Sequence, residues 1–303
     1  ALTLLALPAD PEGRLETAQC ASIDLAFFSG DLYPGSSRQF FSTVRKAPTL
    51  KWLHVSNAGV DHPIYAEMQQ RGARLTTSVG ATAEPIAQTA IAGMLMLGRG
   101  FPHWLAGQRT KTWEPLRGAS APRDMRGQHV VVVGLGNIGR NIARFAQALG
   151  MKVTGIRRSP KRDDDPCDSV CPPSELRALL PHTDWLVLAC PLTPETKNLI
   201  DADALAALPK GARFVNIARG EVVDEPALIA SLQSGHLGGA YLDVFVKEPL
   251  PVESPLWDLP NVIVTPHNSA TSSGNEARVF QLFRDNLGRW FRGEPLVNEV
   301  PKP

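Results

Sequence analysis

The sequence predicts an α/β protein with two doubly wound parallel-sheet domains. Short apolar runs alternate with helical patterns along the chain, as in parallel sheets covered by helices. The length of 303 residues exceeds what one hydrophobic core usually organises, which favours two domains of unequal size. In addition, a run of valines at 130–133 enters a glycine-rich turn, which is typical of the first strand of a doubly wound domain.

Four apolar runs in the first part of the chain are expected to contribute strands. They are 2–7, 25–28, 52–55 and 74–77. An apolar helix is predicted over 83–97, beginning near Glu84 and Pro85. The next segment, 99–126, is rich in Trp, Pro, Arg and Gly and has no clear periodicity. We therefore place a domain boundary between residues 96 and 97.

A second alternating series follows that boundary. Its predicted strands are 130–133, 152–156, 185–189, 214–216, 239–243 and 262–265, and its predicted helices are 138–149, 174–180, 202–208 and 225–234. A last helix, 275–291, comes after the series closes and is expected to return to the first domain. The first domain is therefore predicted to be discontinuous, with residues 1–96 and 275–303, and the second to span 97–274.

Charge and hydropathy argue against nucleic acid and membranes as partners. Lys and Arg number 31 against 30 Asp and Glu, so the chain as a whole has no positive excess to hold a polyanion. The longest apolar stretch, 86–97, is roughly half of the ~20 residues that a membrane span requires. The first residues lack a basic region and precede Pro8 and Asp10, which suits a strand better than a signal peptide.

The cysteines indicate neither a metal site nor a disulfide framework. Their spacing lacks the CxxC pattern of zinc and redox sites, and they are few for this length: Cys20, Cys167, Cys171 and Cys190. We expect free thiols, no metal and a cytoplasmic location.

The glycine-rich turn after 130–133 predicts a dinucleotide site. Gly134 allows the tight turn, Gly136 lets the backbone approach a pyrophosphate, and Gly139 lets the helix pack closely on the strand. Amides at the start of that helix, around Asn137 and Ile138, would bind the anion. Three glycines alone also suit an ordinary turn, but the strand before, the amphipathic helix after and a second strand ending at 156 favour the cofactor.

The residues after the second strand predict which dinucleotide binds. An NAD site normally has Asp or Glu there, whereas an NADP site offers arginine to the 2′-phosphate. Here the strand ends in Arg157, Arg158 and Ser159, and the acids at 163–165 are interpreted as solvated charges. NADP(H) is therefore expected to be preferred, with NAD possible. The alternative is that both arginines are simply exposed at a strand end.

Three polar residues at or just beyond strand ends suggest one reaction. Arg219 offers a bidentate grip on a carboxylate, His267 titrates near neutral pH and suits proton transfer, and Glu248 could orient and charge that imidazole. Taken singly, Arg219 suits a solvated turn, Glu248 suits a surface loop, and His267 suits a turn in which the imidazole caps a backbone group. Their joint occurrence after a glycine turn favours reduction of a 2-keto acid.

These segments resemble the signature blocks of the D-2-hydroxyacid dehydrogenase family over nearly the whole chain, and most closely its glyoxylate and hydroxypyruvate reductases. The resemblance implies a Rossmann dinucleotide-binding domain and a smaller, discontinuous, flavodoxin-like substrate domain. It also implies that Arg219 binds substrate and polarises the keto group, that His267 donates the proton and that Glu248 is its partner.

The resemblance extends to further contacts with the cofactor and the substrate. It places Asp243 at the nicotinamide carboxamide, Ile217 and Ala218 near the nicotinamide, and the loop from Cys190 and Pro191 to Thr196 along the ribose and adenine. The segment 56–61 resembles the loop whose amides hold the substrate carboxylate, which implies roles for Ala58, Gly59 and Val60.

Some features leave the assignment open. Asn268 and Ser269 replace the apolar and small residues common after the histidine, so they could alter contacts with substrate or nicotinamide. The family also includes dinucleotide-sensing co-repressors, and formate or phosphonate dehydrogenases share the cofactor domain. Finally, Phe101, Trp104 and Trp113 lack a periodicity that would bury them, which predicts a homodimer interface, and in the family this region reaches toward a partner subunit.

Overall fold

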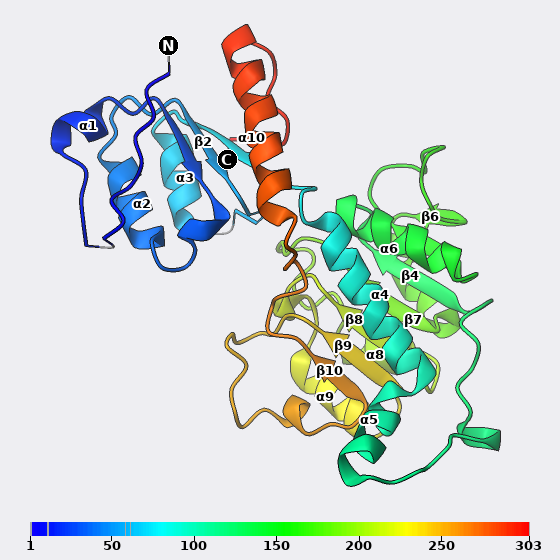
Figure 1. The fold of residues 1–303 in the computed structure, drawn as a ribbon. Helices are drawn as coiled ribbons and strands as arrows, with labels where there is room; N and C mark the ends of the chain where they lie inside the picture. Colours follow the sequence, from blue (N-terminus) through cyan, green and yellow to red (C-terminus); the bar gives the residue numbers. More distant parts are fainter. Residues whose placement is uncertain (1, 11, 58, 61, 303) are drawn as a thin grey trace. The chain divides into compact units, whose positions relative to one another are not determined.

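The computed structural model describes residues 2–10, 12–57, 59–60 and 62–302. The chain forms two compact units: a smaller unit of Ala1–Thr82 with Ser272–Pro303, and a larger unit of Ala83–Thr271. Each unit is built on a parallel sheet with helices, which confirms the predicted α/β fold class (Figure 1). Within the described residues, no helix combines the length and the hydropathy needed to cross a membrane.

The smaller unit contains a three-stranded parallel sheet in the order β1-β2-β3, with strands Leu25–Phe28, Trp52–Val55 and Arg74–Thr77. Its helices are α1 (Thr17–Ala21), α2 (Ser37–Arg45), α3 (Pro63–Gln70) and α10 (Asn275–Arg292). On one sheet face, Leu53 and Val55 pack with side chains of α2 and α3. On the other face, Phe283 of α10 stacks on Phe27 and Trp52. The C-terminal helix therefore belongs to this unit's core.

Residues 2–7 do not form the predicted strand. Leu2 and Leu4 are 64% and 92% exposed, and Leu7 alone of the three packs against the core. The segment has no regular secondary structure and no ladder to a neighbouring strand in the described chain. The prediction was wrong because an apolar run shows only that burial would be favourable, not that a sheet edge is there to pair with it.

The larger unit contains a seven-stranded parallel sheet in the order β10-β9-β8-β7-β4-β5-β6. The strands are β4 (His129–Val133), β5 (Lys152–Ile156), β6 (Ser169–Cys171), β7 (Trp185–Leu188), β8 (Arg213–Asn216), β9 (Gly239–Leu242) and β10 (Val262–Val264). The strand order reverses between β4 and β7, as in doubly wound nucleotide-binding sheets. The sequence predicted all of these strands except β6, whose three residues are too short for a periodic signal.

Helices cover both faces of this sheet. On one face are α4 (Ala83–Arg99) and α6 (Asn137–Ala148), and on the other are α7 (Leu176–Leu179), α8 (Ala202–Ala207) and α9 (Glu225–Gln233) (Figure 1). Val130 and Val132 of β4 face the first group, and Val131 and Val133 face the second. Alternate side chains of the central strand thus serve two cores.

Helix α4 packs within the larger unit. A Cβ on Gly93 would lie 2.5 Å from Cγ of Tyr241 in β9, so the glycine lets the helix approach the sheet closely. The predicted domain boundary at 96/97 lies near the C-terminal end of α4, whereas the compact units divide at its N-terminal end.

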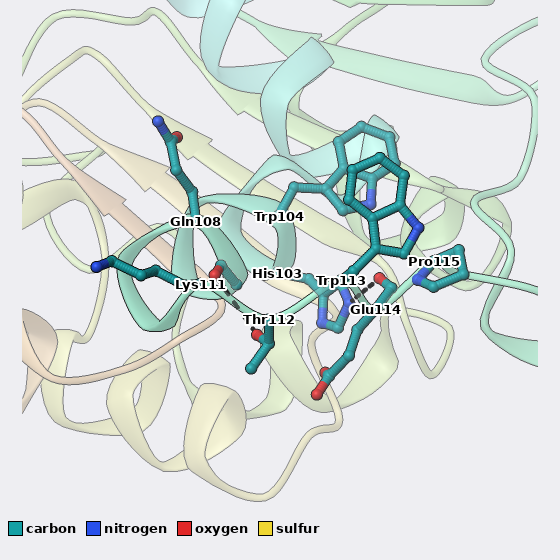
Figure 2. A pocket seen from close by; sticks show the side chains of 9 residues that line it. His103, Trp104, Gln108, Lys111, Thr112, Trp113, Glu114 and Pro115 are labelled. Atoms are coloured by element: carbon teal, nitrogen blue, oxygen red, sulfur yellow. Dashed lines mark hydrogen bonds between the residues drawn. The ribbon is translucent and has the colours of Figure 1, made fainter.

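Beyond α4, the short helix α5 (Phe101–Thr110) has no buried residue. Phe101, Trp104 and Trp113 are 42%, 41% and 95% exposed. A pocket of about 550 Å³ lies between α5 and the segment that follows it, and Trp104 and Trp113 are among its lining residues (Figure 2). This segment therefore presents aromatic surface that the chain itself leaves uncovered.

Candidate active site

The glycine turn lies at the carboxyl end of β4, next to the end of β7. Gly134 has φ +98°, and a Cβ there would lie 2.7 Å from the backbone of Ala189 and Cys190. A Cβ on Gly139 would lie 1.9 Å from the carbonyl oxygen of Gly134. Only glycine fits at either position, because the turn, the start of α6 and the chain after β7 are in backbone contact.

The same turn leaves room and donors for a phosphate group. Gly136 is exposed, and a Cβ built on it meets no atom within 4 Å. No side chain among the described residues caps α6, so the N–H groups of Asn137, Ile138 and Gly139 have neither an intrahelical partner nor a cap. Free helix N-terminal donors facing an open space suit the pyrophosphate of a dinucleotide.

The two arginines after β5 differ in exposure, because Arg157 is largely buried and Arg158 is exposed. The guanidinium of Arg157 donates to the carbonyl of Ser159 at 3.1 Å and to the carboxylate of Asp165 at 2.6 and 3.0 Å, and its side chain is 13% exposed. Arg158 and Ser159 are exposed. Of the two guanidinium groups predicted to face a 2′-phosphate, the structure therefore exposes Arg158 and holds Arg157 inside the loop.

The interpretation of residues 163–165 as solvated charges is wrong for Asp165. Its carboxylate is fully buried and accepts hydrogen bonds from Arg157, from Arg140 of α6 and from the backbone N–H of Arg162 at 2.7 Å. The Arg157 guanidinium is the main cause that holds the pKa of Asp165 below its ordinary value. Asp163 and Asp164 are exposed as expected.

The loop after β7 closes on itself on the other side of β4. The hydroxyl of Thr196 donates to the carbonyl of Pro191 at 2.7 Å and accepts from the N–H of Thr193 at 2.7 Å. Burial raises the pKa of the Cys190 thiol to about 11, so the thiol stays neutral. The pKa of Glu195 is lowered by its hydrogen bond with Thr193 and, to a smaller extent, by the charge of Arg158.

Arg219 follows β8 in a segment braced by an asparagine. The side chain of Asn216 accepts from the N–H of Ala218 at 3.0 Å and donates to the carbonyl of Arg219 at 3.0 Å. A Cβ on Gly220 would lie 2.0–2.3 Å from the backbone of Phe245 and Val246. The Arg-Gly pair is thus held against the loop after β9. Asn216, buried at the strand end, is a positioning residue that the sequence reasoning missed.

His267 and Glu248 are hydrogen-bonded, as predicted for a proton donor and its partner. Nδ1 of His267 lies 2.7 Å from Oε2 of Glu248, and Oε1 accepts from the N–H of Phe245 at 3.0 Å. An ionised carboxylate only accepts, so Nδ1 carries the proton and Nε2 is left for other contacts. His267 has φ +49°, and its N–H donates to the carbonyl of Asp243 at 2.8 Å.

Asp243, at the end of β9, is 2% exposed. Its carboxylate accepts from the hydroxyl of Thr265, the N–H groups of Asn268 and Ser269, and the hydroxyl of Ser269. The two residues that depart from the family pattern thus bind this carboxylate. The implied contact of Asp243 with a nicotinamide carboxamide stays a prediction.

The remaining predicted site residues lie in two places. Ile217 and Ala218 are buried beyond the end of β8. Gly59 and Val60 lie after β2 in the smaller unit, where Val60 packs against the core and the carbonyl of Gly59 accepts from the side chain of Asn57. Ala58 lies outside the described residues. The glycine turn, Arg158, Arg219, Glu248 and His267 all follow carboxyl ends of strands of one sheet.

The chain is similar to known proteins. Residues 91–269 match the D-isomer specific 2-hydroxyacid dehydrogenase family, NAD binding domain. The chain belongs to the D-isomer specific 2-hydroxyacid dehydrogenase family. It is therefore related to oxidoreductases that use a nicotinamide dinucleotide, and it is similar to their glyoxylate and hydroxypyruvate reductases.

Three relatives define this similarity. The chain is 34% identical to an (S)-sulfolactate dehydrogenase of Chromohalobacter salexigens, over 80% of this chain and 78% of that protein. It is 30% identical to a glyoxylate/hydroxypyruvate reductase of Arabidopsis thaliana, over 84% of this chain and 77% of that protein. The crystal structure of an NADPH-dependent glyoxylate/hydroxypyruvate reductase from Sinorhizobium meliloti, in complex with NADP and sulfate, matches with TM-score 0.77 and 32% identity, over 93% of this chain and 85% of that one.

Proposed function

We propose that this chain reduces a small 2-keto acid of the glyoxylate or hydroxypyruvate type to the D-2-hydroxy acid, with NADPH as the preferred cofactor. The observation that carries the proposal is the hydrogen-bonded pair of His267 and Glu248 at the same sheet edge as Arg219 and the glycine turn. In open α/β sheets, ligands bind outside the carboxyl ends of the strands.

Arg219 binds the substrate carboxylate and polarises its keto group. A guanidinium offers paired donors that fix the orientation of a planar carboxylate, which an ammonium cannot do. The close backbone approach at Gly220 and the bridge from Asn216 hold the main chain of Arg219, so its side chain starts from a fixed position. A role of Ala58, Gly59 and Val60 in binding the substrate carboxylate is proposed from the resemblance of their loop alone.

His267 donates a proton from Nε2 to the keto oxygen. The bound nicotinamide supplies the hydride. Glu248 accepts from Nδ1, which fixes the ring's orientation and leaves Nε2 to face the substrate. Because Glu248 also accepts from the N–H of Phe245, the carboxylate does not depend on the imidazole for its position.

In this proposal, residues at the ends of β4, β5 and β7 would hold the cofactor. The N-terminus of α6 would bind the pyrophosphate, the loop from Cys190 to Thr196 would contact the ribose and adenine, and Ile217, Ala218 and Asp243 would contact the nicotinamide. The exposed Arg158 and Ser159 and the absence of an acid at 157–159 support preference for NADPH. The NADPH dependence of the Sinorhizobium meliloti relative points the same way.

One spectrophotometric panel tests the reaction. Absorbance at 340 nm is followed with NADPH and, in parallel, NADH, using glyoxylate, hydroxypyruvate and pyruvate as oxidants, and formate, phosphite and (S)-sulfolactate with the oxidised cofactors. We expect NADPH oxidation with glyoxylate or hydroxypyruvate, and a kcat/KM ratio of NADPH to NADH above about ten. Turnover of formate, phosphite or sulfolactate alone would overturn the substrate class. Cofactor binding without any turnover would favour a dinucleotide sensor.

We further propose that the protein is a cytoplasmic homodimer joined through α5 and the segment after it. Helix α5 buries none of its own side chains, and the neighbouring Trp113 is 95% exposed. Large exposed aromatic surface of this kind commonly marks an interface.

A further inference from the structure

Asp165 pairs with Arg157 but not with Arg158, and it has no role in the reaction described above. Asp165 lies in the loop between β5 and β6, yet its carboxylate is fully buried. It is joined to Arg157, which leaves the end of β5, and to Arg140, which lies one turn inside α6. One buried carboxylate therefore ties the loop after β5 to the helix that follows the glycine turn.

This contact determines which arginine is available to a ligand. Arg157 gives its donors to Asp165 and to the carbonyls of Ser159 and Pro160, all inside the loop. With Arg157 held inside the loop, Arg158 is left exposed to solvent.

We propose that Asp165 is a positioning residue for cofactor specificity, which holds Arg157 and the loop so that Arg158 and Ser159 are presented to the 2′-phosphate of the dinucleotide. This inference rests on the proposed preference for NADPH. Arg158 is then the side chain that contacts the phosphate, and Arg157, despite its place in the sequence, supports the loop from inside.

The buried charge of Asp165 is essential to this arrangement. A carboxylate accepts from two guanidinium groups and the N–H of Arg162 at once, whereas an amide in its place would turn donors toward arginines. Replacing Asp165 by Asn would leave the largely buried Arg157 without its anion, while Arg140 would keep only the exposed Asp164, so the loop would have to rearrange. The position of Arg158 would then no longer be fixed.

The experiment measures binding of cofactor fragments, so it needs no substrate and no turnover. Calorimetry gives the dissociation constants of 2′,5′-ADP and 5′-AMP, which differ only by the 2′-phosphate. In the wild-type protein we expect 2′,5′-ADP to bind more than about tenfold more tightly. In Arg158→Ala, the two dissociation constants should lie within about twofold of each other. In Asp165→Asn, their ratio should fall by about fivefold or more, while the dissociation constant of 5′-AMP changes little.

Two further variants separate positioning from general damage. Asp163→Asn makes the same chemical change at an exposed position and should keep the wild-type ratio. Arg140→Met removes the helix side of the contact but leaves Asp165 paired with Arg157, so it should fold and lower the ratio in the same direction. It is the decisive variant if Asp165→Asn fails to fold.

The outcomes distinguish this inference from the proposed function. A wild-type ratio near one would overturn the NADPH preference itself. A high wild-type ratio that survives in both Asp165→Asn and Arg140→Met would leave the preference intact and overturn the role of Asp165. If these variants lose affinity for 2′,5′-ADP and 5′-AMP to the same extent, the contact of Asp165 supports only the fold. That result would also overturn the role of Asp165 in cofactor specificity.

Discussion

The backbone N–H of Ser269 donates to both carboxylate oxygens of Asp243, at 3.1 and 3.2 Å, and its hydroxyl donates to Oδ2 of the same carboxylate. The hydroxyl of Thr265 and the N–H of Asn268 donate to Oδ1 at 2.6 and 2.9 Å. The turn that carries His267 is thus built around one buried carboxylate. Ser269, which departs from the family pattern, is part of that support.

Replacing Ser269 by Ala should weaken this turn. The variant removes one donor to a buried carboxylate, a loss of about 1.5–3 kcal/mol for a hydrogen bond to a charged group. We expect kcat to fall roughly tenfold, because His267 is less well fixed, while the dissociation constant of NADPH changes little. Steady-state kinetics and cofactor titration measure the two effects.

Thr271→Val serves as the matched control for that change. Thr271 donates to the side chain of Asn268, outside the Asp243 carboxylate. The Thr271→Val variant should keep kcat within about twofold of the wild-type value. A Ser269→Ala enzyme with unchanged kcat would show that the hydroxyl plays no part in placing His267.

His267→Ala should remove the proposed proton donor. A positioned general acid contributes about 10²–10⁴-fold to the rate, so kcat is expected to fall by that order. Cofactor affinity should persist, because the proposed dinucleotide site at the glycine turn and the start of α6 is separate from His267. Near wild-type kcat in this variant would contradict the assignment.

Arg219→Lys keeps the positive charge but loses the paired geometry. We expect a higher KM for the keto acid together with a lower kcat, because an ammonium cannot hold the carboxylate in one orientation. The measurement is a full set of initial rates over keto acid concentration. Wild-type values of both parameters would mean that another cation binds the carboxylate.

The elements that the sequence predicted well are those with a local signal. The valines of β4, the glycines after it and the amphipathic α6 each show their structure through spacing alone. The pair of His267 and Glu248 was predictable because both follow adjacent strands of a parallel sheet, whose carboxyl ends meet at one edge.

The features that were missed depend on partners distant in sequence. A run of three acids at 163–165 normally indicates a solvated loop, and only the fold shows that Asp165 is buried between Arg140 and Arg157. The segment 2–7 has the composition of a strand but no partner strand. β6 is too short for its alternation to be recognised.

The segment that begins at Phe101 should join two copies of the chain. If α5 and Trp113 are buried in a dimer, light scattering at micromolar concentration should give twice the monomer mass of 32.8 kDa. Replacing Trp104 and Trp113 by Ser should shift the equilibrium toward monomer. Trp257→Ser, at a half-exposed tryptophan of the same unit, is the control and should remain dimeric. A wild-type monomer would contradict the proposal.

His54 should make the stability of the smaller unit depend on pH. It is fully buried on β2, and burial lowers its pKa from 6.5 to about 4. Its hydrogen bonds suit the neutral ring. The hydroxyl of Ser78 donates to the carbonyl of Val55, so Nε2 must donate to Ser78, while Nδ1 accepts from Thr76, whose oxygen accepts from Trp52. Protonation of the ring would place a hydrogen on Nδ1, which would displace the hydroxyl hydrogen of Thr76 from this contact.

The sign of the effect follows from proton binding. Between pH 6.5 and about 4, the unfolded chain binds a proton at His54 and the folded chain does not, so the free energy of unfolding falls as pH falls through this range. A shift of this size corresponds to about 3 kcal/mol, present in full above pH 6.5 and lost by pH 4. Urea unfolding followed by tryptophan fluorescence, at several pH values, measures the slope. His54→Asn should flatten it, whereas His182→Asn, at an exposed histidine, should retain it. Equal slopes in wild type and His54→Asn would show that the buried imidazole does not govern this range.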